Sequence, residues 1–443
     1  MHITHVGIDD TDSARGMCTT YLATLIVEDL IDQRAEFVDY PNLIRLNPNI
    51  PWKTRGNAAV ALRFHTENSQ KSFNIAKKLL AENSEAKEGL ADPGLVMHVG
   101  NVPKDVVEFS RRAMRDVISK SDAEDIIKKH SMQHYAEGSR RGLIGAIAAI
   151  GNTLPKDHTF EIMAYRDKNH VGQRRVDKES VIRMNRLFSK YTFNSYDESA
   201  DRVLICPHGP DPVLCGIRGE SPAELVKALS ALKFEEPVER WMVFRSNQGT
   251  GDHLAESLKE FRAHASGFVR GSVVDRAKVQ QGGHVFFYIR DGPDRIKCAC
   301  YEPAGELRKV VLSLIKGDQI EVGGGVRKAS KLNPAVLNIE YLKVFNLTRN
   351  KVMENPLCPN CGKRMKSEGR GKGFSCEDYG TRASKRIAKL IPRNVKEGLY
   401  LPPLHSQRHL TRPLKRYGIE NSPPSRMVEN WSRIFEREIV GMW

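Results

Sequence analysis

The pattern of apolar residues changes near Ser266, and this change divides the chain into more than one kind of domain. Before it, residues 2–8 alternate as in a strand, residues 18–32 carry apolar side chains at helical spacing, and a further helix is expected at 103–120. After it, five short β-type runs follow one another, with a helix-like run at 305–314 between the third and the fourth. This order is typical of an OB-fold barrel, and other small β-barrels are the alternative.

A single compact core cannot hold 443 residues, because cores stop growing at roughly 250–300 residues. We therefore predict a multidomain α+β protein with three regions. Residues 1–265 form an α/β region with the candidate catalytic residues, residues 266–347 form an OB-fold nucleic-acid-binding domain, and residues 348–443 form a zinc-ribbon-like domain with a basic C-terminal segment. Within that segment residues 427–439 are predicted to be helical, and the segment is expected to wrap RNA or to pack on the ribbon.

Composition excludes the membrane and secreted classes of protein. No apolar run reaches the ~18–20 residues needed to span a bilayer, and the N-terminus lacks the basic and apolar stretches of a secretion signal. We expect a cytoplasmic protein without a membrane partner, whose eight cysteines stay reduced. The sequence leaves the oligomeric state open.

Positive charge is concentrated towards the end of the chain. The formal net charge is +15, and residues 351–443 hold 19 basic and only 9 acidic side chains. Such a local excess of positive charge suits a polyanion, and nucleic acid is the leading candidate. The alternative is a solvated basic tail.

Three carboxylates, Asp9, Asp10 and Asp12, follow directly after the first predicted strand. At this spacing they repel one another unless a cation lies among them, and Mg²⁺ is commonly held by one or two carboxylates together with substrate phosphates. The alternative is an exposed acidic turn that caps the next helix. We favour a Mg²⁺ site with catalytic carboxylates.

Two segments carry residues that suit phosphate groups. Thr19 lies in the first turn of a predicted helix, where free backbone N–H groups and the helix dipole favour a phosphate, although capping by threonine is the alternative. In the second segment, Arg141 can neutralise phosphate charge, while Gly142 and Gly145 let the backbone approach closely. Tight packing of a small-residue helix on a sheet explains these glycines equally well. With Arg15, these residues form the predicted ATP- and phosphate-binding set.

Two polar loops carry further candidates for substrate binding. Asp197 lies near a predicted strand end, and Asn247, Gln248 and Asp252 lie in a glycine-bearing loop after the strand predicted at residues 241–245. Both are candidate substrate loops. Plain turns are the alternative.

A cysteine cluster begins with Cys358 and Cys361, a CxxC turn followed by glycine, and Cys376 opens a second turn of the same kind. Structural zinc is four-coordinate, and two such turns normally supply the four ligands. Tyr379 occupies the place of the fourth cysteine, so the sequence leaves zinc binding open. The candidates for the fourth ligand are Asp378, His405, His409 and water.

Four motifs, in this order, are GIDDTDS, RGMCTT, RRGLIGAIAAIG and RSNQGTGDHL. Together with the predicted barrel and ribbon, they resemble the TiaS family, the archaeal 2-agmatinylcytidine synthetases that act on an isoleucine tRNA. The resemblance extends over essentially the full length. It departs at Tyr379, where that family usually has cysteine.

The resemblance implies an enzyme that uses ATP and Mg²⁺ to join agmatine to C2 of the wobble cytidine in the minor isoleucine tRNA, whose anticodon is CAU. ATP is then split to AMP and phosphates, and the modified tRNA reads AUA as isoleucine. The resemblance also implies a kinase-like and a ferredoxin-like domain within residues 1–265. It implies further that Thr19 is phosphorylated by the protein itself, and that Asp9, Asp10 and Asp12 lie in the Mg–ATP site.

Two other classes of function stay open. One is a non-catalytic OB-fold RNA-binding protein, against which the three adjacent carboxylates argue. The other is a kinase or ligase that acts on another RNA or another amine, and only the resemblance argues against it.

Overall fold

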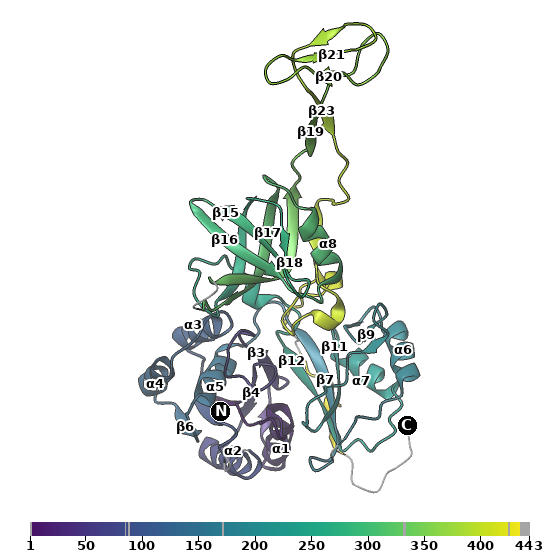
Figure 1. Ribbon diagram of the computed structural model, residues 1–443. Helices are drawn as coiled ribbons and strands as arrows, with labels where there is room; N and C mark the ends of the chain where they lie inside the picture. The colour runs from purple at the N-terminus through teal and green to yellow at the C-terminus, as the bar shows by residue number, and fades with distance from the viewer. Residues whose placement is uncertain are drawn as a thin grey trace. The chain divides into compact units, whose positions relative to one another are not determined.

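The computed structural model describes residues 2–84, 86, 89–170, 172–330, 334–423 and 426–434 (Figure 1). Contacts group the chain into two compact units. The first holds Met1–Phe268, Gly323–Val336 and the chain from Pro402 onward, and the second holds Val269–Val322 and Leu337–Leu401. The predicted mixed α+β class is confirmed. Among the described residues, no helix is long and apolar enough to cross a membrane.

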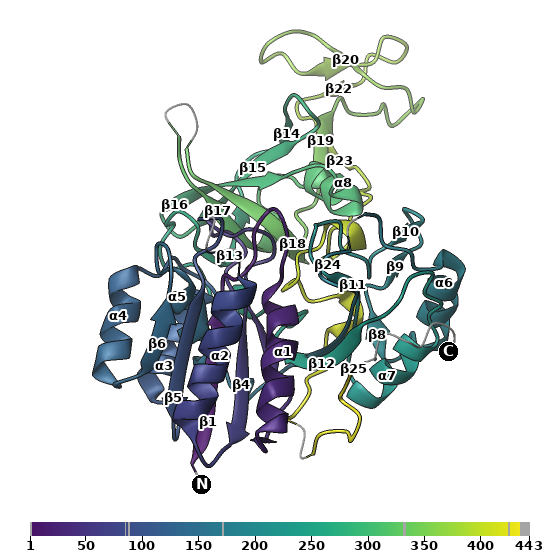
Figure 2. The same ribbon diagram turned by 90° about the horizontal axis from the view of Figure 1, so that it is seen from below.

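One sheet runs through the first unit, and its first half has the strand order β6-β5-β1-β4-β3, with β2 also paired to β4. Successive side chains of a strand point to opposite faces, so Val60 and Leu62 of β4 pack in one core while Ala59 and Ala61 pack in another. Helices α1 and α2 cover the first face, and α3, α4 and α5 cover the second (Figure 2). The strands are β1 Ile3–Asp9, β2 Glu36–Phe37, β3 Asn42–Arg45, β4 Ala58–His65, β5 Gly94–Val99 and β6 Gln133–Ala136. The helices are α1 Thr19–Asp32, α2 Ser69–Asn83, α3 Lys104–Ala113, α4 Lys120–Lys129 and α5 Gly142–Gly151.

The helix predicted at residues 103–120 is shorter in the structure, because α3 ends at Ala113. Ser119 then caps α4: its hydroxyl accepts a hydrogen bond from the Asp122 N–H, and the Asp122 carboxylate accepts one from the Ser119 N–H. Serine at this position favours the start of a new helix over the continuation of the old one. The pattern of apolar residues alone does not mark the boundary between α3 and α4.

The second half of the sheet has the order β12-β7-β11-β8. Strand β12 joins the halves, because it pairs in parallel with β3 through Arg245 and Ser246 and antiparallel with β7 along its whole length. Helices α6 and α7 contribute apolar side chains to the same core as α1 and α2. The elements are β7 Thr159–Tyr165, α6 Lys178–Leu187, β8 Thr192–Phe193, β9 Tyr196–Asp197, β10 Arg202–Val203, β11 Val213–Gly219, α7 Pro222–Ser230, β12 Arg240–Ser246 and the short 3₁₀ helix η2 Asp252–Leu254.

The C-terminal segment returns to this sheet. Its described part contains the short 3₁₀ helices η3 Leu404–Ser406 and η4 Leu414–Arg416, and it ends in β25, Ser432–Ile434, which pairs antiparallel with β12. From Pro402 onward the segment therefore belongs to the first unit, whereas its earlier residues 382–383 and 387–390 form strands of the cysteine-containing module, as the second alternative predicted. The helix predicted at residues 427–439 is wrong for residues 427–434, which contain no helix and end in the strand at 432–434. The rest of the predicted helix, residues 435–439, lies outside the described residues. The apolar side chains of Met427, Val428 and Trp431 pack against the sheet core at spacings of three and four residues, a pattern that also fits a helix, so the pattern alone did not exclude one.

The predicted five-stranded barrel is confirmed, with its helix between the third and fourth long strands. Its sheet has the order β13-β17-β18-β16-β15-β14, and β13 also pairs with β15, which closes it. On β15, Phe287 is buried while Phe286 and Tyr288 lie half-buried on the opposite side, as strand alternation requires. The elements are β13 Ser266–Val273, β14 Lys278–Val279, β15 Val285–Asp291, β16 Asp294–Cys300, α8 Gly305–Ser313, β17 Gln319–Arg327, β18 Val336–Asn346 and, paired with β18, β24 Gly398–Tyr400.

A small module lies between β18 and β24 in the chain. Its base is the antiparallel pair β19 Lys351–Glu354 and β23 Ile387–Leu390, and its outer part is the three-stranded sheet β20 Lys366–Ser367, β21 Phe374–Ser375 and β22 Arg382–Ala383. Its apolar cluster consists of Cys358, Met365, Phe374 and Cys376. All eight cysteines of the chain are free thiols, as predicted.

Candidate active site

The three carboxylates lie where β1 ends, and their charges are crowded. Asp9 is the last residue of β1, and Asp10 takes a left-handed backbone conformation with φ 56°. Burial, and then the charge of Asp10, raises the pKa of Asp9 well above its usual range. Burial, and then the charge of Asp12, raises the pKa of Asp10 to about 7. A positive charge near these carboxylates would relieve both effects. Among the described residues, the group whose ligand atoms already converge closely enough for a metal ion is the cysteine cluster and not these three aspartates.

Arg55 connects this cluster to the second half of the sheet. Its Nε lies 2.9 Å from Asp12 Oδ2, and its Nη1 lies 2.9 Å from Asp211 Oδ2. It also donates a hydrogen bond to the backbone oxygen of Met17. One guanidinium therefore fixes the acidic turn, the loop before α1 and the loop before β11.

A first cavity, called here the acidic cavity, opens over the carboxylates. Its walls include Asp9, Asp10 and Asp12 together with Arg141 and Gly145 of the predicted phosphate-binding set. The guanidinium carbon of Arg141 lies 3.9 Å from the ring centre of Trp52, which also lines the cavity and is 53% exposed. A cavity with carboxylates, a cation and an exposed indole has the groups that a nucleotide with its metal ion requires.

A second cavity of about 300 Å³, called here the threonine cavity, adjoins the first. Both are lined by Asp12, Arg55, Gly56 and Ala58. The remaining walls of the threonine cavity come from α1, β3, β7, β11 and the C-terminal segment, and include Thr19, Thr20, Arg45, Glu161, Asp211, Arg218 and His409.

Thr19 is the first residue of α1 and is held by its neighbours. Its Oγ1 lies 3.1 Å from Thr11 Oγ1, and the residue is buried. The N-cap of α1 is Cys18, which makes no capping hydrogen bond through its side chain. Helix capping by Thr19, the alternative from sequence, is therefore not its role here. Its hydroxyl belongs to the wall of the threonine cavity.

The glycines of α5 serve close packing, and one of them also shapes the site. A Cβ on Gly142 would lie 2.4 Å from the backbone nitrogen of Gly94, so this glycine lets the helix touch β5. A Cβ on Gly145 would lie 1.8 Å from Asp9 Oδ2. Gly145 thus sets the position of Asp9 as well as lining the acidic cavity. Arg15, by contrast, is exposed and lines neither cavity.

The four residues predicted in the polar loops line neither cavity, and two of them, Asn247 and Gln248, hold Arg45 of the threonine cavity from behind. Asn247 pairs with the backbone of Arg45, and Gln248 Oε1 accepts a hydrogen bond from Arg45 Nε at 2.9 Å. Asp197 Oδ2 lies 2.7 Å from His405 Nδ1, which docks the C-terminal segment. Asp252 begins η2, and burial raises its pKa.

Sequence reasoning missed several groups that line the threonine cavity. Glu161 lies in the middle of β7 and contacts Arg45 and Arg218, at 3.4 and 3.3 Å. The nearby charge of Arg45, followed by burial, holds the pKa of His409 well below its usual range, so its imidazole is uncharged at neutral pH. Neither residue belongs to a local motif. Only the return of the C-terminal segment to the sheet brings His409 here.

Known protein domains match this chain in three places. Residues 5–73 match the TiaS TCKD domain, residues 140–253 the TiaS FLD domain, and residues 355–395 the TiaS C-terminal zinc ribbon domain. The tRNA 2-agmatinylcytidine synthetase TiaS of Cenarchaeum symbiosum is 40% identical over 434 residues, which cover 98% of this chain and 97% of that protein. The TiaS of Methanosarcina acetivorans is 41% identical over 428 residues, with 94% and 98% covered.

The chain belongs to the TiaS family. Solved TiaS structures agree with this along nearly the whole chain. The crystal structure of TiaS in complex with an isoleucine tRNA and ATP has a TM-score of 0.85 at 36% identity and covers 98% of this chain and 100% of that chain. The complex of TiaS with the same tRNA, AMPCPP and agmatine has a TM-score of 0.83 at 35% identity and covers 94% and 98%. In this chain the acidic turn and Thr19 line two adjoining cavities.

Proposed function

We propose that this protein is an ATP-dependent enzyme that joins agmatine to C2 of the wobble cytidine in the isoleucine tRNA with a CAU anticodon. ATP is split to AMP and phosphates, and the product lets the tRNA read AUA. The observation that carries this proposal is the pair of adjoining cavities that share the Asp12–Arg55 contact. One has the groups for a metal–nucleotide complex, and the other has the carboxylates and threonines for an amine and a phosphoryl group.

The acidic cavity is proposed as the ATP site of a kinase-like domain. Asp9, Asp10 and Asp12 hold Mg²⁺, which neutralises phosphate charge when it is bound. The raised pKa values of Asp9 and Asp10 support this, since buried carboxylates without a cation destabilise one another. Arg141 adds a positive charge, and Gly145 leaves room beside Asp9.

The chemistry requires a better leaving group than hydroxide on C2 of the cytosine. Transfer of the terminal phosphoryl group of ATP to the O2 oxygen supplies one and leaves ADP: the agmatine nitrogen then forms a bond to C2, the C2–O2 bond breaks, and the oxygen leaves as phosphate. Formation of AMP requires that a second phosphoryl group leave the nucleotide, and the Thr19 hydroxyl is its proposed first acceptor before water releases it as phosphate. Phosphoryl transfer depends mainly on positioning and on neutralisation of charge. The cytosine must leave the anticodon stack to reach the site, as bases do in other base-modifying enzymes.

The threonine cavity is proposed as the place where agmatine meets the base, and a ferredoxin-like domain that contains β7 and β11 supplies part of its wall. Glu161 and Asp211 are the carboxylates that suit its guanidinium group. The amine attacks only after it loses its proton, and the uncharged imidazole of His409 is a proton acceptor in the same cavity. The carboxylates proposed for agmatine therefore lie on β7 and before β11, in place of Asp197 and Asp252.

The barrel and the zinc ribbon are proposed to hold the tRNA. On β15, Phe286 and Tyr288 lie next to cations, with Lys297 Nζ 4.8 Å from the ring centre of Phe286 and the Arg295 guanidinium 4.2 Å from that of Tyr288. Accessible aromatic rings beside basic side chains suit stacked bases and phosphates.

Incubation of the purified protein with labelled agmatine, ATP, Mg²⁺ and isoleucine tRNA transcripts with CAU anticodons tests the activity. We expect agmatine on the wobble cytidine, found by mass spectrometry of digested tRNA and strictly dependent on ATP. Tight tRNA binding without incorporation of any amine would instead support an RNA-binding protein. Incorporation of another amine, or into another RNA, would support the alternative ligase.

Removal of the Thr19 hydroxyl is expected to abolish modification of tRNA. The Thr19→Ala variant should also lose the phosphate that mass spectrometry finds on this residue after incubation with ATP, because no other atom of the side chain can accept it. Thr19→Ser keeps a hydroxyl and should retain both. Thr24→Ala removes a buried hydroxyl from the same helix outside both cavities and serves as the control. Full activity of Thr19→Ala would contradict a role for this threonine.

A methyl group on Gly145 is expected to lower the rate of modification about 100-fold, the loss that a misplacement of about 1 Å can cause. The reason is that the Cβ would lie 1.8 Å from Asp9 Oδ2, so the carboxylate must move. The measurement is the single-turnover rate of Gly145→Ala with saturating tRNA. Gly16→Ala is the matched control, because the closest atom to its Cβ, the Pro210 oxygen, is 3.9 Å away. Equal rates for both variants would show that Gly145 does not position Asp9.

A further inference from the structure

The two cysteine turns of the ribbon have the same backbone geometry. In the first, the Cys358 N–H donates to the Lys363 oxygen at 2.8 Å, and the Gly362 N–H donates to the Cys358 oxygen at 2.8 Å. In the second, the Cys376 N–H donates to the Thr381 oxygen at 2.9 Å, and the Gly380 N–H donates to the Cys376 oxygen at 2.8 Å. Gly362 and Gly380 both have positive φ, 71° and 64°. The second turn therefore keeps the form of a metal-binding turn.

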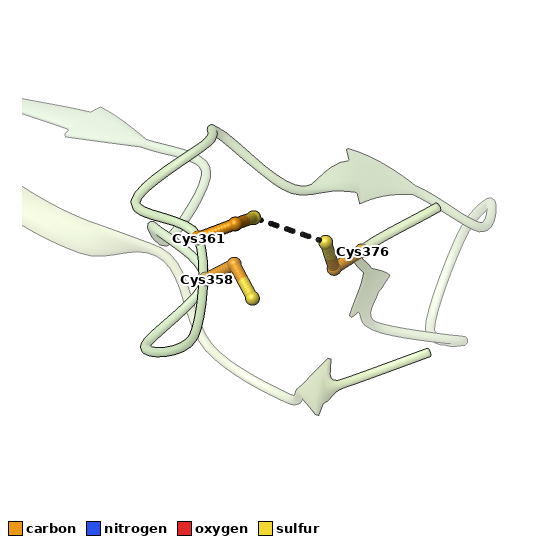
Figure 3. A group of neighbouring side chains, drawn as sticks. All are labelled: Cys358, Cys361 and Cys376. Atoms are coloured by element: carbon orange, nitrogen blue, oxygen red, sulfur yellow. Dashed lines mark hydrogen bonds between the residues drawn. The ribbon is translucent and has the colours of Figure 1, made fainter. Parts of the chain in front are cut away.

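Tyr379 has in the second turn the position that Cys361 has in the first. The side chain of Tyr379 is 60% exposed, although both turns are otherwise alike. The three cysteine sulfurs converge: all lie within 4.8 Å of one another, and Cys361 Sγ and Cys376 Sγ are 3.6 Å apart (Figure 3). Three sulfur ligands thus converge, and the residue at the fourth cysteine position is an exposed tyrosine.

The acidic neighbours of the cluster are engaged elsewhere, and the Thr381 hydroxyl lies 3.7 Å from Cys358 Sγ. Asp378 Oδ2 lies 2.6 Å from Lys363 Nζ, and Glu377 Oε1 lies 2.6 Å from Lys366 Nζ. Among the described His, Cys, Asp and Glu side chains, the group that can hold a metal ion here contains the three cysteines alone. His405 and His409, the other candidates from sequence, contact Asp197 and Arg218. Among the described residues of these four types, the ribbon thus supplies three converging ligands and no fourth.

We infer that the ribbon binds zinc through Cys358, Cys361 and Cys376 and leaves the fourth coordination position open to an exchangeable ligand from solution. Tetrahedral zinc accepts this arrangement, since sites with three protein ligands and one exchangeable ligand are common. Each thiol gives its proton to the buffer as it binds the metal. The inference concerns the ribbon alone and holds whether or not the proposed activity is correct.

Metal titration of the full-length protein tests the inference, with Co²⁺ as a spectroscopic probe and Zn²⁺ as competitor. We compare the natural chain with Tyr379→Cys, which restores a fourth sulfur to the turn, and with Tyr379→Phe, which removes only the phenol oxygen. Cys358→Ser reports any metal bound by the other cysteines. An added small thiol, 2-mercaptoethanol, probes the open position.

We expect one Co²⁺ per chain, with an absorption spectrum that changes towards that of four thiolates when 2-mercaptoethanol is added. Tyr379→Cys should show the four-thiolate spectrum from the start, should not respond to the added thiol, and should bind Zn²⁺ at least about tenfold more tightly. Loss of a group that only hydrogen-bonds to a metal ligand lowers the affinity for the metal about 10–100-fold, and a sulfur bound directly to the metal contributes more. Tyr379→Phe should match the natural chain.

Three results would overturn the inference. The first is a natural chain that binds no metal while Tyr379→Cys does. The second is a natural chain whose spectrum ignores the added thiol, which would indicate a fourth ligand from the protein. The third is a weaker or altered site in Tyr379→Phe, which would make the phenol oxygen that ligand.

Discussion

Replacement of Asp9 by Asn is expected to lower ATP-dependent modification of tRNA by about 10²–10³-fold, the range seen when one preorganised electrostatic contact is removed from an active site. The side chain keeps its size, so the contact with α5 at Gly145 is kept. What is lost is a charge next to Asp10 and the affinity for Mg²⁺ that depends on it. The measurements are the single-turnover rate at saturating ATP and its dependence on Mg²⁺ concentration.

The same variant should separate catalysis from folding. Burial and the charge of Asp10 disfavour ionised Asp9, so the amide is expected to leave the free energy of unfolding of the metal-free protein unchanged or higher. Binding of tRNA should stay nearly intact. Glu67→Gln removes an exposed carboxylate from the same unit and is the control for net charge. The assignment of Asp9 to catalysis would be contradicted if the Asp9→Asn protein kept its activity. It would also be contradicted if the variant lost tRNA binding while it kept its catalytic activity.

Replacement of Arg416 by Met is expected to destabilise the first unit by about 3–5 kcal/mol, the cost of removing one partner from a buried ion pair. Arg416 has no exposed surface, and its guanidinium lies 2.9 Å from Asp157 Oδ1 and 2.7 Å from Glu220 Oε1. It also donates to the backbone oxygen of Gly249 at 2.7 Å. Without the Arg416 guanidinium, the carboxylates of Asp157 and Glu220 lose a positive charge that offsets the cost of their burial. Denaturant unfolding followed by circular dichroism measures the loss.

Arg426→Met provides the matched control, since Arg426 belongs to the same segment but is exposed. A Glu220→Gln change made in the Arg416→Met protein should recover part of the stability, because it neutralises a carboxylate that the first change left without its partner. Equal stability of the Arg416 and Arg426 variants would show that the ion pairs do not hold the segment.

Features that depend on neighbours in sequence were predictable. The acidic turn follows β1 because three carboxylates in four residues cannot continue a buried strand, and the barrel strands alternate visibly, as Phe287 and its more accessible neighbours illustrate. Features that depend on distant pairing were not. In the sequence, Glu161 is a single polar residue within an apolar run that predicts a strand. It lies in the threonine cavity only because β7 pairs with β12. The sequence pattern predicts a helix at residues 432–434. In the structure these residues form a strand that pairs with β12, because the backbone N–H and C=O groups on that side of β12 need hydrogen-bond partners.

The position of His409 in the threonine cavity has a consequence for how the protein is made. Thr19 and Glu161 leave the ribosome long before the barrel and the ribbon, whereas His409 follows both. All residues that line the acidic cavity precede Phe268 in the chain, whereas the wall of the threonine cavity lacks the His409 imidazole until the late segment has been made. The threonine cavity is thus complete only after the segment that contains His409 has docked. The order of synthesis is enough to make this the last step in building the cavity.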